Sequence, residues 1–230
     1  MKTRSVRRLQ APAKAAAPPG TLNEEAYRRI EEMIVTLELK PGSVVSEAML
    51  SDLIGIGHTP IREALQRLSR EHLVQILPRR GVVVTGIDVG QQLQILETRR
   101  ELDRLIARSG AARSTPAERQ EMTRIALRMQ GAVAAGDLRE FLQLDNEMNV
   151  QAARACRNDI AANTVAALHA ASRRFWFYHH HRHGQAGKTM DLHVALARAL
   201  ASGDANCAAV ASDRLIDDLF EFARNTLIPA

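Results

Sequence analysis

Residues 46–68 hold two short helical patterns separated by a glycine-containing turn, and this arrangement restricts the possible folds more than any other feature of the chain. Ser46 is placed to cap the first helix, which ends at Gly55. In the second helix, Thr59 is expected as the N-cap and Pro60 as the first helical residue. Two helices joined in this way predict a helix-turn-helix.

The flanking residues extend this unit on both sides. Apolar residues at helical spacing predict a preceding helix over residues 23–37. Two β-prone runs, 73–77 and 82–85, predict a hairpin after the second helix. The turn of this hairpin contains Arg79, Arg80 and Gly81. A basic hairpin tip beside a helix-turn-helix is placed to contact DNA, so residues 22–86 are predicted to form a winged helix-turn-helix domain.

Beyond this domain the pattern is helical throughout, and residues 87–230 are predicted to form an all-α antiparallel bundle. The fold class is therefore mostly α. The breaks follow capping signals such as Thr115 with Glu118, and glycine followed by aspartate at Gly136 and Gly203. The expected helices cover roughly 88–109, 116–135, 137–156, 158–178, 188–202 and 204–227.

Basic charge is concentrated in the N-terminal third. The formal net charge is +5, and residues 1–86 carry 13 Lys/Arg against 9 Asp/Glu, whereas residues 87–230 carry 18 against 17. Residues 1–21 contain five Lys or Arg, three prolines and no acidic residue, which predicts a disordered basic tail. Such a tail can lie on DNA phosphates or act as a solubilising extension. An organellar transit peptide is a third alternative, disfavoured by the prolines.

Several classes of function find no support in the sequence. Cys156 and Cys207 have no spacing typical of zinc binding or a disulfide framework, which favours reduced thiols and a cytoplasmic protein. No apolar run has the length of a membrane span, and the first twenty residues lack the apolar region of a secretory signal. The nucleophile-elbow, phosphate-loop and zinc-protease motifs are absent, so an enzyme is not expected.

The start of the second helix in the helix-turn-helix is the expected DNA-reading end. His58, Thr59 and Arg62 lie there. Arg62 has the geometry to bind guanine through the O6 and N7 acceptors, and Thr59 suits a phosphate. The alternative is that Arg62 pairs with a nearby carboxylate. A nonspecific architectural DNA protein is a further alternative. Such a protein would need no ligand cavity, so evidence for ligand binding would argue against it.

The chain resembles the GntR family of bacterial transcription regulators, in the FadR-type subfamily. The resemblance rests on a nearly continuous set of residues: Leu39-Lys40-Pro41-Gly42, Ser46-Glu47, Ile54-Gly55-Ile56, Thr59-Pro60-Ile61-Arg62-Glu63-Ala64-Leu65, Leu73-Val74 and Arg80-Gly81. It implies a homodimer that binds double-stranded operator DNA, commonly as a repressor, with the contacts made by Ser46, His58, Thr59, Arg62, Arg79, Arg80 and Gly81. Family members usually carry Ser-Arg where this chain has Gly57-His58.

Four polar side chains interrupt the apolar stripes of the second half. Asp145 and Asn149 share the apolar face of one predicted helix, and Arg99 and His193 lie among leucine and isoleucine residues of two others. A carboxylate on a core face must be paired, hydrogen-bonded or metal-bound. These residues predict a polar cavity inside the bundle.

The second half resembles the FCD-type effector domains of this subfamily, which bind small carboxylates, commonly through a divalent metal. The resemblance implies effector binding by Arg99, Asp145, Asn149 and His193, and a metal site at Asp145, Asn149 and His193. Two family histidine positions hold Asn149 and Leu215 here, which weakens the metal hypothesis. Direct hydrogen bonding of an organic acid is favoured, and a buried polar pair that fixes helix register is the third alternative.

Residues 173–183 combine aromatic residues, histidines and arginines, and their role is open. Adventitious metal binding, a lid over the cavity, and a solvated helix end and loop with the aromatics packed on the bundle are the three alternatives, of which the last is favoured. The linker Gly86–Val89 is expected to be the hinge between the two domains.

Overall fold

The computed structural model describes residues 21–78, 81–180 and 186–227. The predicted basic tail therefore lies outside the described residues, except for its last residue, and so do Arg79, Arg80 and His181–His183. The N-terminal elements are α1 (Leu22–Val35), β1 (Val44–Val45), α2 (Glu47–Ile54), α3 (His58–Arg70), β2 (Val74–Leu77) and β3 (Gly81–Val84). The helices that follow are α4 (Val89–Arg113), α5 (Pro116–Ala135), α6 (Leu138–Ala155), α7 (Asp159–His179), α8 (Ala186–Ser202) and α9 (Ala205–Asn225).

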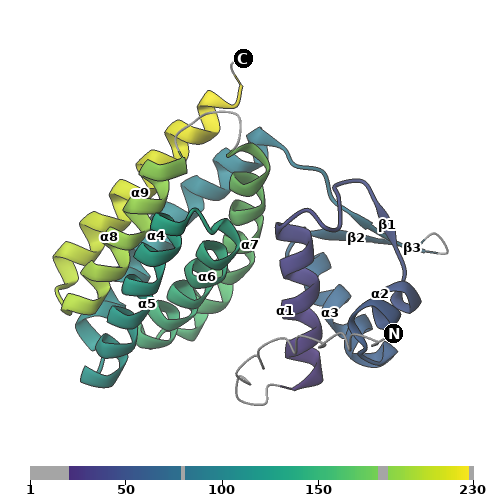
Figure 1. Ribbon diagram of the computed structural model, residues 1–230, viewed down its shortest axis with the longest axis horizontal. Helices are drawn as coiled ribbons and strands as arrows, with labels where there is room; N and C mark the ends of the chain where they lie inside the picture. Colours follow the sequence, from purple (N-terminus) through teal and green to yellow (C-terminus); the bar gives the residue numbers. More distant parts are fainter. Residues whose placement is uncertain (1–20, 79–80, 181–185, 228–230) are drawn as a thin grey trace, which may run out of the picture.

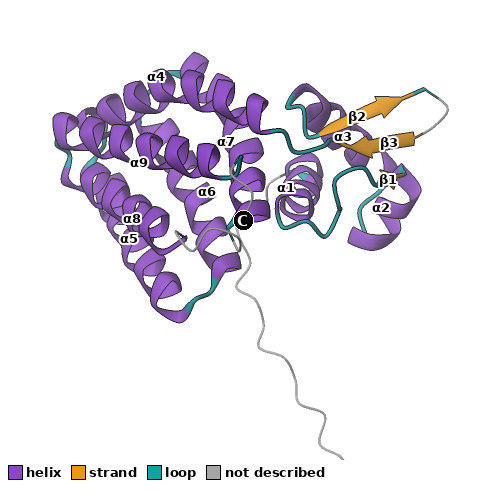
Figure 2. Cartoon of the chain, turned by 90° about the horizontal axis from the view of Figure 1, so that it is seen from above, coloured by secondary structure: helices purple, strands orange, loops and turns teal. Residues whose placement is uncertain are grey.

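The elements α1 to β3 form one unit, called the head below. Its three helices pack beside an antiparallel sheet of order β1-β3-β2, in which Val74 pairs with Val84 and Leu77 with Gly81. The β2–β3 hairpin extends away from the helical half of the molecule (Figures 1 and 2). The head has a separate apolar core, which includes Ile30, Leu50 and Leu65. The predicted winged helix-turn-helix architecture is confirmed.

Helices α4 to α9 form the second unit, called the bundle below. Figure 1 shows them as a layered array beside the head, with α4 against α9 and α5 against α8. Phe141, Met129 and Phe222 are among its fully buried side chains. The prediction of a C-terminal helical bundle is confirmed. Within the part of the chain that the structure describes, no helix is long and apolar enough to cross a bilayer.

The capping signals in the sequence locate most helix ends. Thr115 and Glu118 form a complete capping box at the start of α5, and Gly136 ends this helix in a left-handed conformation with φ of 65°. Asn158 and Asp204 cap α7 and α9 through their side chains. These predicted caps are confirmed. Each side chain supplies an acceptor to backbone N–H groups that a helix leaves unpaired at its start.

Three details of the fold differ from the sequence-based expectation. Helix α3 begins at His58, so Gly57 rather than Thr59 occupies the N-cap, with no side-chain capping bond. Helix α4 continues to Arg113, four residues past the expected end at 109, because no break occurs before Ser114. The two-residue strand β1 was not predicted, since its two valines gain their pairing only from β3, far along the chain.

The head and the bundle meet along α1 and α7. Ala170 of α7 belongs to the apolar core of the head. Arg173 of α7 is ion-paired with Glu31 of α1, with 2.5 Å between Nη2 and Oε1, and both side chains are more than nine-tenths buried. Arg174 donates to the backbone carbonyls of Thr85 and Gly86 at 3.1 Å, at the start of the linker. Burial lowers the pKa of Arg174 to about 10.

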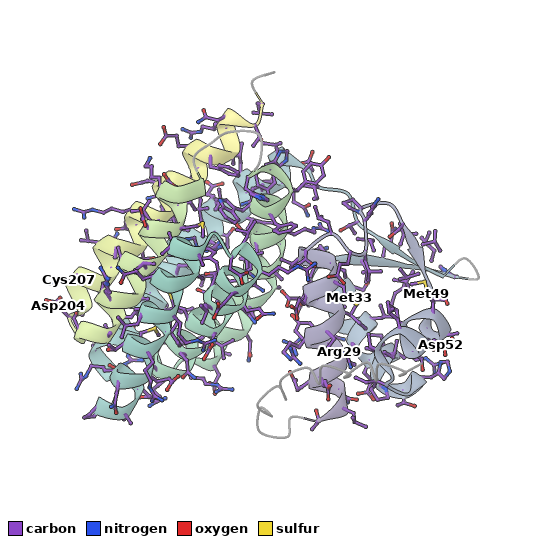
Figure 3. All side chains as sticks on the ribbon, in the orientation of Figure 1. Arg29, Met33, Met49, Asp52, Asp204 and Cys207 are labelled. Carbon is purple, nitrogen blue, oxygen red and sulfur yellow. The ribbon has the colours of Figure 1, made fainter. Side chains whose placement is uncertain are left out.

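Both cysteines are free thiols, in line with the expectation of reduced cysteines. Cys156 is buried. Cys207 is exposed beside Asp204, at the end of the bundle that is farthest from the head, whereas Arg29 and Met49 mark the head itself (Figure 3). The Cys207 thiol is therefore remote from the head.

Candidate functional site

Helix α3 packs its apolar face against the core of the head and exposes its polar face to solvent. Ile61, Ala64, Leu65 and Leu68 are buried. His58, Thr59 and Arg62 are all exposed at the N-terminal end of the helix. The structure thus brings the three predicted base or phosphate contacts onto a single accessible surface, and a helix N-terminus adds unpaired N–H groups that attract anions.

Arg62 forms a bidentate ion pair with Glu47 in this structure, which contains no DNA. Its Nε and Nη2 atoms donate to the two carboxylate oxygens of Glu47 on α2, at 2.9 and 2.8 Å. The bond from Arg62 lowers the pKa of Glu47. The guanidinium side chain is 62% exposed, and exposed pairs of this kind contribute little net stability. The pairing of Arg62 with a nearby carboxylate, which was the alternative interpretation, is present in this structure as an exposed ion pair.

The other predicted DNA contacts have identifiable local roles. The Ser46 hydroxyl caps α2 by accepting from the backbone N–H of Met49 at 3.1 Å. Gly81 has φ of 94°, and an added Cβ there would lie 3.2 Å from the carbonyl oxygen of Val45. Glycine is thus required where β3 begins, next to β1.

The bundle contains a cavity lined by residues from α4, α6, α7, α8 and α9. The space between atoms in this region is about 350 Å³, part of which is open solvent rather than enclosed cavity. The four predicted effector-binding residues, Arg99, Asp145, Asn149 and His193, all line it. The other polar lining residues come from α7: His169, Ser172, Arg173 and Trp176. His169 and Ser172 were not singled out from the sequence, whereas Arg173 and Trp176 belong to the 173–183 segment whose role was left open.

Asp145, Asn149 and His193 form a small hydrogen-bonded group at this cavity. The Asn149 amide donates to Asp145 Oδ1 at 3.0 Å. His193 Nδ1 lies 2.8 Å from the carbonyl oxygen of Thr189, so this nitrogen must carry the proton and donate. His193 Nε2 faces Asp145 Oδ1 at 3.5 Å. The group therefore presents one carboxylate, one amide and one imidazole nitrogen to the cavity.

Arg99 belongs to a second group that the sequence did not predict as a unit. Arg99 Nε donates to Asp103 Oδ2 at 2.9 Å, and His169 Nε2 lies 2.7 Å from Asp103 Oδ1. Burial alone would raise the pKa of Asp103, but the charge of Arg99 and the bonds from Arg99 and His169 hold it at about 2. Burial lowers the pKa of His169, which favours the neutral ring. Arg99 is thus neutralised within the bundle.

At the predicted metal site, Asp145, Asn149 and His193 offer a divalent metal a poor set of ligands. Among the described residues, no group of three His, Cys, Asp or Glu side chains is arranged to hold a metal. Only Asp145 and His193 are strong ligands, while the Asn149 amide is engaged with Asp145 and Leu215 is a buried apolar side chain. Two strong ligands fall short of the three or four that transition-metal sites use.

The described part of the aromatic and histidine-rich segment packs against the bundle. Phe175 and Trp176 are buried in its apolar core, and Phe141 lies 6.1 Å from Trp176 between ring centroids. The expected packing of the aromatic side chains is confirmed for these residues. His179 and His180 are also buried, so the expectation of a solvated helix end is wrong for them, whereas His181–His183 lie outside the described residues.

A winged helix-turn-helix with an exposed basic recognition helix, joined to a helical bundle that holds a polar cavity, defines a DNA-binding transcription regulator with a sensor domain. The chain belongs to the GntR family of bacterial regulatory proteins. The model of that family matches residues 22–84, and the FCD domain model matches residues 94–218. The expectation that the chain is not an enzyme is confirmed by this membership.

Known relatives agree with this assignment. An HTH-type transcriptional regulator in an unstable DNA locus of Streptomyces ambofaciens is 33% identical over 153 residues, which cover 64% of this chain and 61% of the relative. The HTH-type transcriptional repressor RspR of Escherichia coli K12 is 26% identical over 66% of this chain and 67% of its own length. Among solved structures, Escherichia coli McbR/YncC is similar in fold, with a TM-score of 0.77 at 17% identity over 91% of this chain and 100% of that one.

Proposed function

We propose that the protein is a cytoplasmic, homodimeric repressor that binds a specific operator through α3 and the β2–β3 hairpin. The observation that carries the proposal is the exposed group of His58, Thr59 and Arg62 at the N-terminal end of α3. A two-fold dimer would present two such helices to half-sites about one helical turn apart. Arg79, Arg80, Gly81 and Ser46 would contact the DNA backbone beside them.

The bundle cavity is the proposed effector site, and a small organic acid is the proposed effector. Arg99 and Asn149 supply donors for carboxylate oxygens, and Asp145, with His193 Nε2 beside it, accepts from a hydroxyl or protonated group of the ligand. The effector would shift operator affinity by favouring one arrangement of the two heads. The linker that starts at Gly86, where the Arg174 contacts end, is the proposed hinge and domain boundary.

Replacing Arg62 with alanine should reduce affinity for the operator at least tenfold, because a bidentate contact to guanine would be lost. Fluorescence anisotropy with DNA from upstream of the protein's own gene, at two salt concentrations, measures this loss. Arg70→Ala is the matched control, since Arg70 is exposed at the opposite end of the same helix. It should change affinity less than twofold.

The outcome separates sequence reading from charge alone. Equal losses for both arginine variants, disappearing at the higher salt, would contradict base reading by Arg62. If the upstream DNA binds weakly to the wild type, selection from a random DNA pool should still enrich a sequence. Failure to enrich any sequence would refute a specific regulator.

Removing the carboxylate that holds Arg62 should increase operator affinity. Glu47→Gln frees the guanidinium fork and removes a negative charge near phosphate, so affinity should rise about threefold at low salt. The gain should shrink at high salt. The same anisotropy titration measures the effect, and a fall in affinity would mean that Glu47 instead holds Arg62 in its DNA-binding position.

A further inference from the structure

Arg173 lies where the cavity and the head meet. Its side chain lines the cavity and is 8% exposed. One end of the guanidinium, Nη2, donates to Oε1 of Glu31, which reaches across from α1. The Glu31 side chain is 7% exposed, so the pair is shielded from solvent on both sides. A single cation therefore belongs both to the cavity wall and to the contact between the head and the bundle.

Two buried donors on residues that line the cavity have no acceptor within the described protein. They are Nη1 of Arg173 and Nε1 of Trp176, and both atoms are buried. Buried N–H groups are nearly always hydrogen-bonded, so two unpaired donors at one cavity require an explanation. An acceptor-rich molecule in the cavity supplies one. A guanidinium with a free N–H selects carboxylate among such molecules, because the planar fork matches its two oxygens.

Among the charged residues that line the cavity, Arg173 is the cation best placed to bind a carboxylate. Arg99 is already paired with Asp103 on its own helix. Asp145 is the one carboxylate among the cavity-lining residues, and it is engaged with Asn149 and His193. The attraction of Glu31 and Asp145 raises the pKa of Arg173 in spite of its burial, so the guanidinium stays charged. Arg173 forms its ion pair with Glu31, which belongs to the head.

We propose that a small carboxylate in the cavity and Glu31 of the head compete for Arg173. Ligand binding would exchange the Glu31–Arg173 ion pair for an Arg173–ligand pair, with Trp176 Nε1 donating to a second oxygen of the ligand. This inference rests on the proposed function of the cavity as an effector site and adds the residue that couples the cavity to the DNA-binding head. Because linkage is reciprocal, whatever strengthens the Glu31 contact weakens ligand binding by the same factor.

Ligand binding to the full chain tests the competition without DNA. Trp176 is the single tryptophan and lines the cavity, so its fluorescence reports occupancy. The probes are acetate, succinate and citrate, with acetamide and succinamide as neutral counterparts. Glu31→Gln should bind the best carboxylate about fivefold more tightly than the wild type does, because Arg173 no longer has a competitor. Arg173→Met should lose carboxylate binding, and the neutral amides should bind to neither variant.

Glu32→Gln is the matched control. Glu32 is the next residue of α1 and also contacts the bundle, through Gln143 at 2.6 Å, but it does not contact Arg173. It should bind carboxylates as the wild type does. Three results would each overturn the proposal: equal affinities for Glu31→Gln and Glu32→Gln, unchanged binding by Arg173→Met, or no binding of any carboxylate probe to Glu31→Gln.

A charge reversal covers the case in which Glu31→Gln does not fold. The double variant Glu31→Arg/Arg173→Glu restores an ion pair but places a carboxylate at the cavity wall. It should fold and lose carboxylate binding, and retained binding would overturn the proposal.

An operator titration then tests the coupling. Carboxylate should weaken DNA binding by the wild type and leave DNA binding by Glu31→Gln unchanged. A carboxylate response that persists in Glu31→Gln would overturn the proposal. If instead DNA binding itself fails in the wild type, the proposed repressor function fails while the Trp176 measurement still decides the competition.

Discussion

Gly110→Leu should lower the free energy of unfolding by about 3 kcal/mol or more, because α4 and α6 cross too closely at this point to admit a side chain. A Cβ atom at Gly110 would lie 2.9 Å from the carbonyl oxygen of Ala152 and 3.7 Å from the backbone nitrogen of Cys156. Both neighbours are backbone atoms of one helix turn, so no side-chain rotation relieves the contact. Urea denaturation followed by circular dichroism measures the loss, and thermal melting should show it as a drop of roughly 6–12 °C.

Gly131→Ala is the control for the general effect of removing a helical glycine. Gly131 lies within α5, is exposed, and has nothing within 4 Å of an added Cβ atom. Alanine there should stabilise the protein by about 0.5–1 kcal/mol through helix propensity. If Gly110→Leu left stability unchanged, the close crossing of α4 and α6 would be refuted.

Asp103→Ala should destabilise the protein by about 3–5 kcal/mol, because it leaves the guanidinium of Arg99 buried without a counter-charge. Wild-type stability should also depend on acidity through the same group. The pKa of Asp103 is about 2 in the folded protein against 3.8 ordinarily. Its contribution, on the order of 2 kcal/mol, is therefore complete above about pH 4 and is lost as the pH falls toward 2.

Neutral His169 adds an earlier phase of acid destabilisation. Burial lowers the pKa of His169, so the unfolded chain takes up a proton near pH 6.5 that the folded chain does not. Wild-type stability should therefore begin to fall as the pH drops below about 6.5. Urea denaturation at a series of pH values measures both phases, and Asp103→Ala should lack the second.

Two further variants isolate the buried pair. Asp213→Ala breaks an exposed Arg–Asp pair, since Arg104 and Asp213 are 3.5 Å apart with side chains 58% and 28% exposed. It should cost under about 1 kcal/mol. Arg99→Met/Asp103→Leu removes both buried charges and should recover most of the loss caused by Asp103→Ala. If this double variant were no more stable than Asp103→Ala, the loss would come from packing rather than from the unpaired charge.

The helices could be predicted because their signals are local. The Thr115–Glu118 capping box marks the start of α5 and Gly136 marks its end, and each signal lies within four residues of the helix end that it defines. Strand β1 and the pairing of the head with the bundle have no such signal. Glu31 and Arg173 are 142 positions apart, and nothing near either residue in the sequence identifies its partner.

The cavity was predicted in part, for a related reason. Asp145 and Asn149 were found because they interrupt an apolar stripe at helical spacing. In α7, His169 and Ser172 interrupt a similar stripe between Val165 and Trp176, and the same criterion would have identified them. Arg173 could not be found in this way, since its importance comes from a carboxylate supplied by another domain.

The contact between α1 and α7 bears on how such regulators can be recombined. Because Ala170 completes the core of the head and Arg173 and Arg174 bind Glu31 and the linker, the surface of the bundle is matched to this particular head. A chimera that joins residues 1–86 to the bundle of another regulator would carry Glu31 without its arginine and an uncovered apolar patch. Exchange of DNA specificity between such proteins therefore requires grafting the face of α7 together with the head, and the linker alone is not a sufficient crossover point.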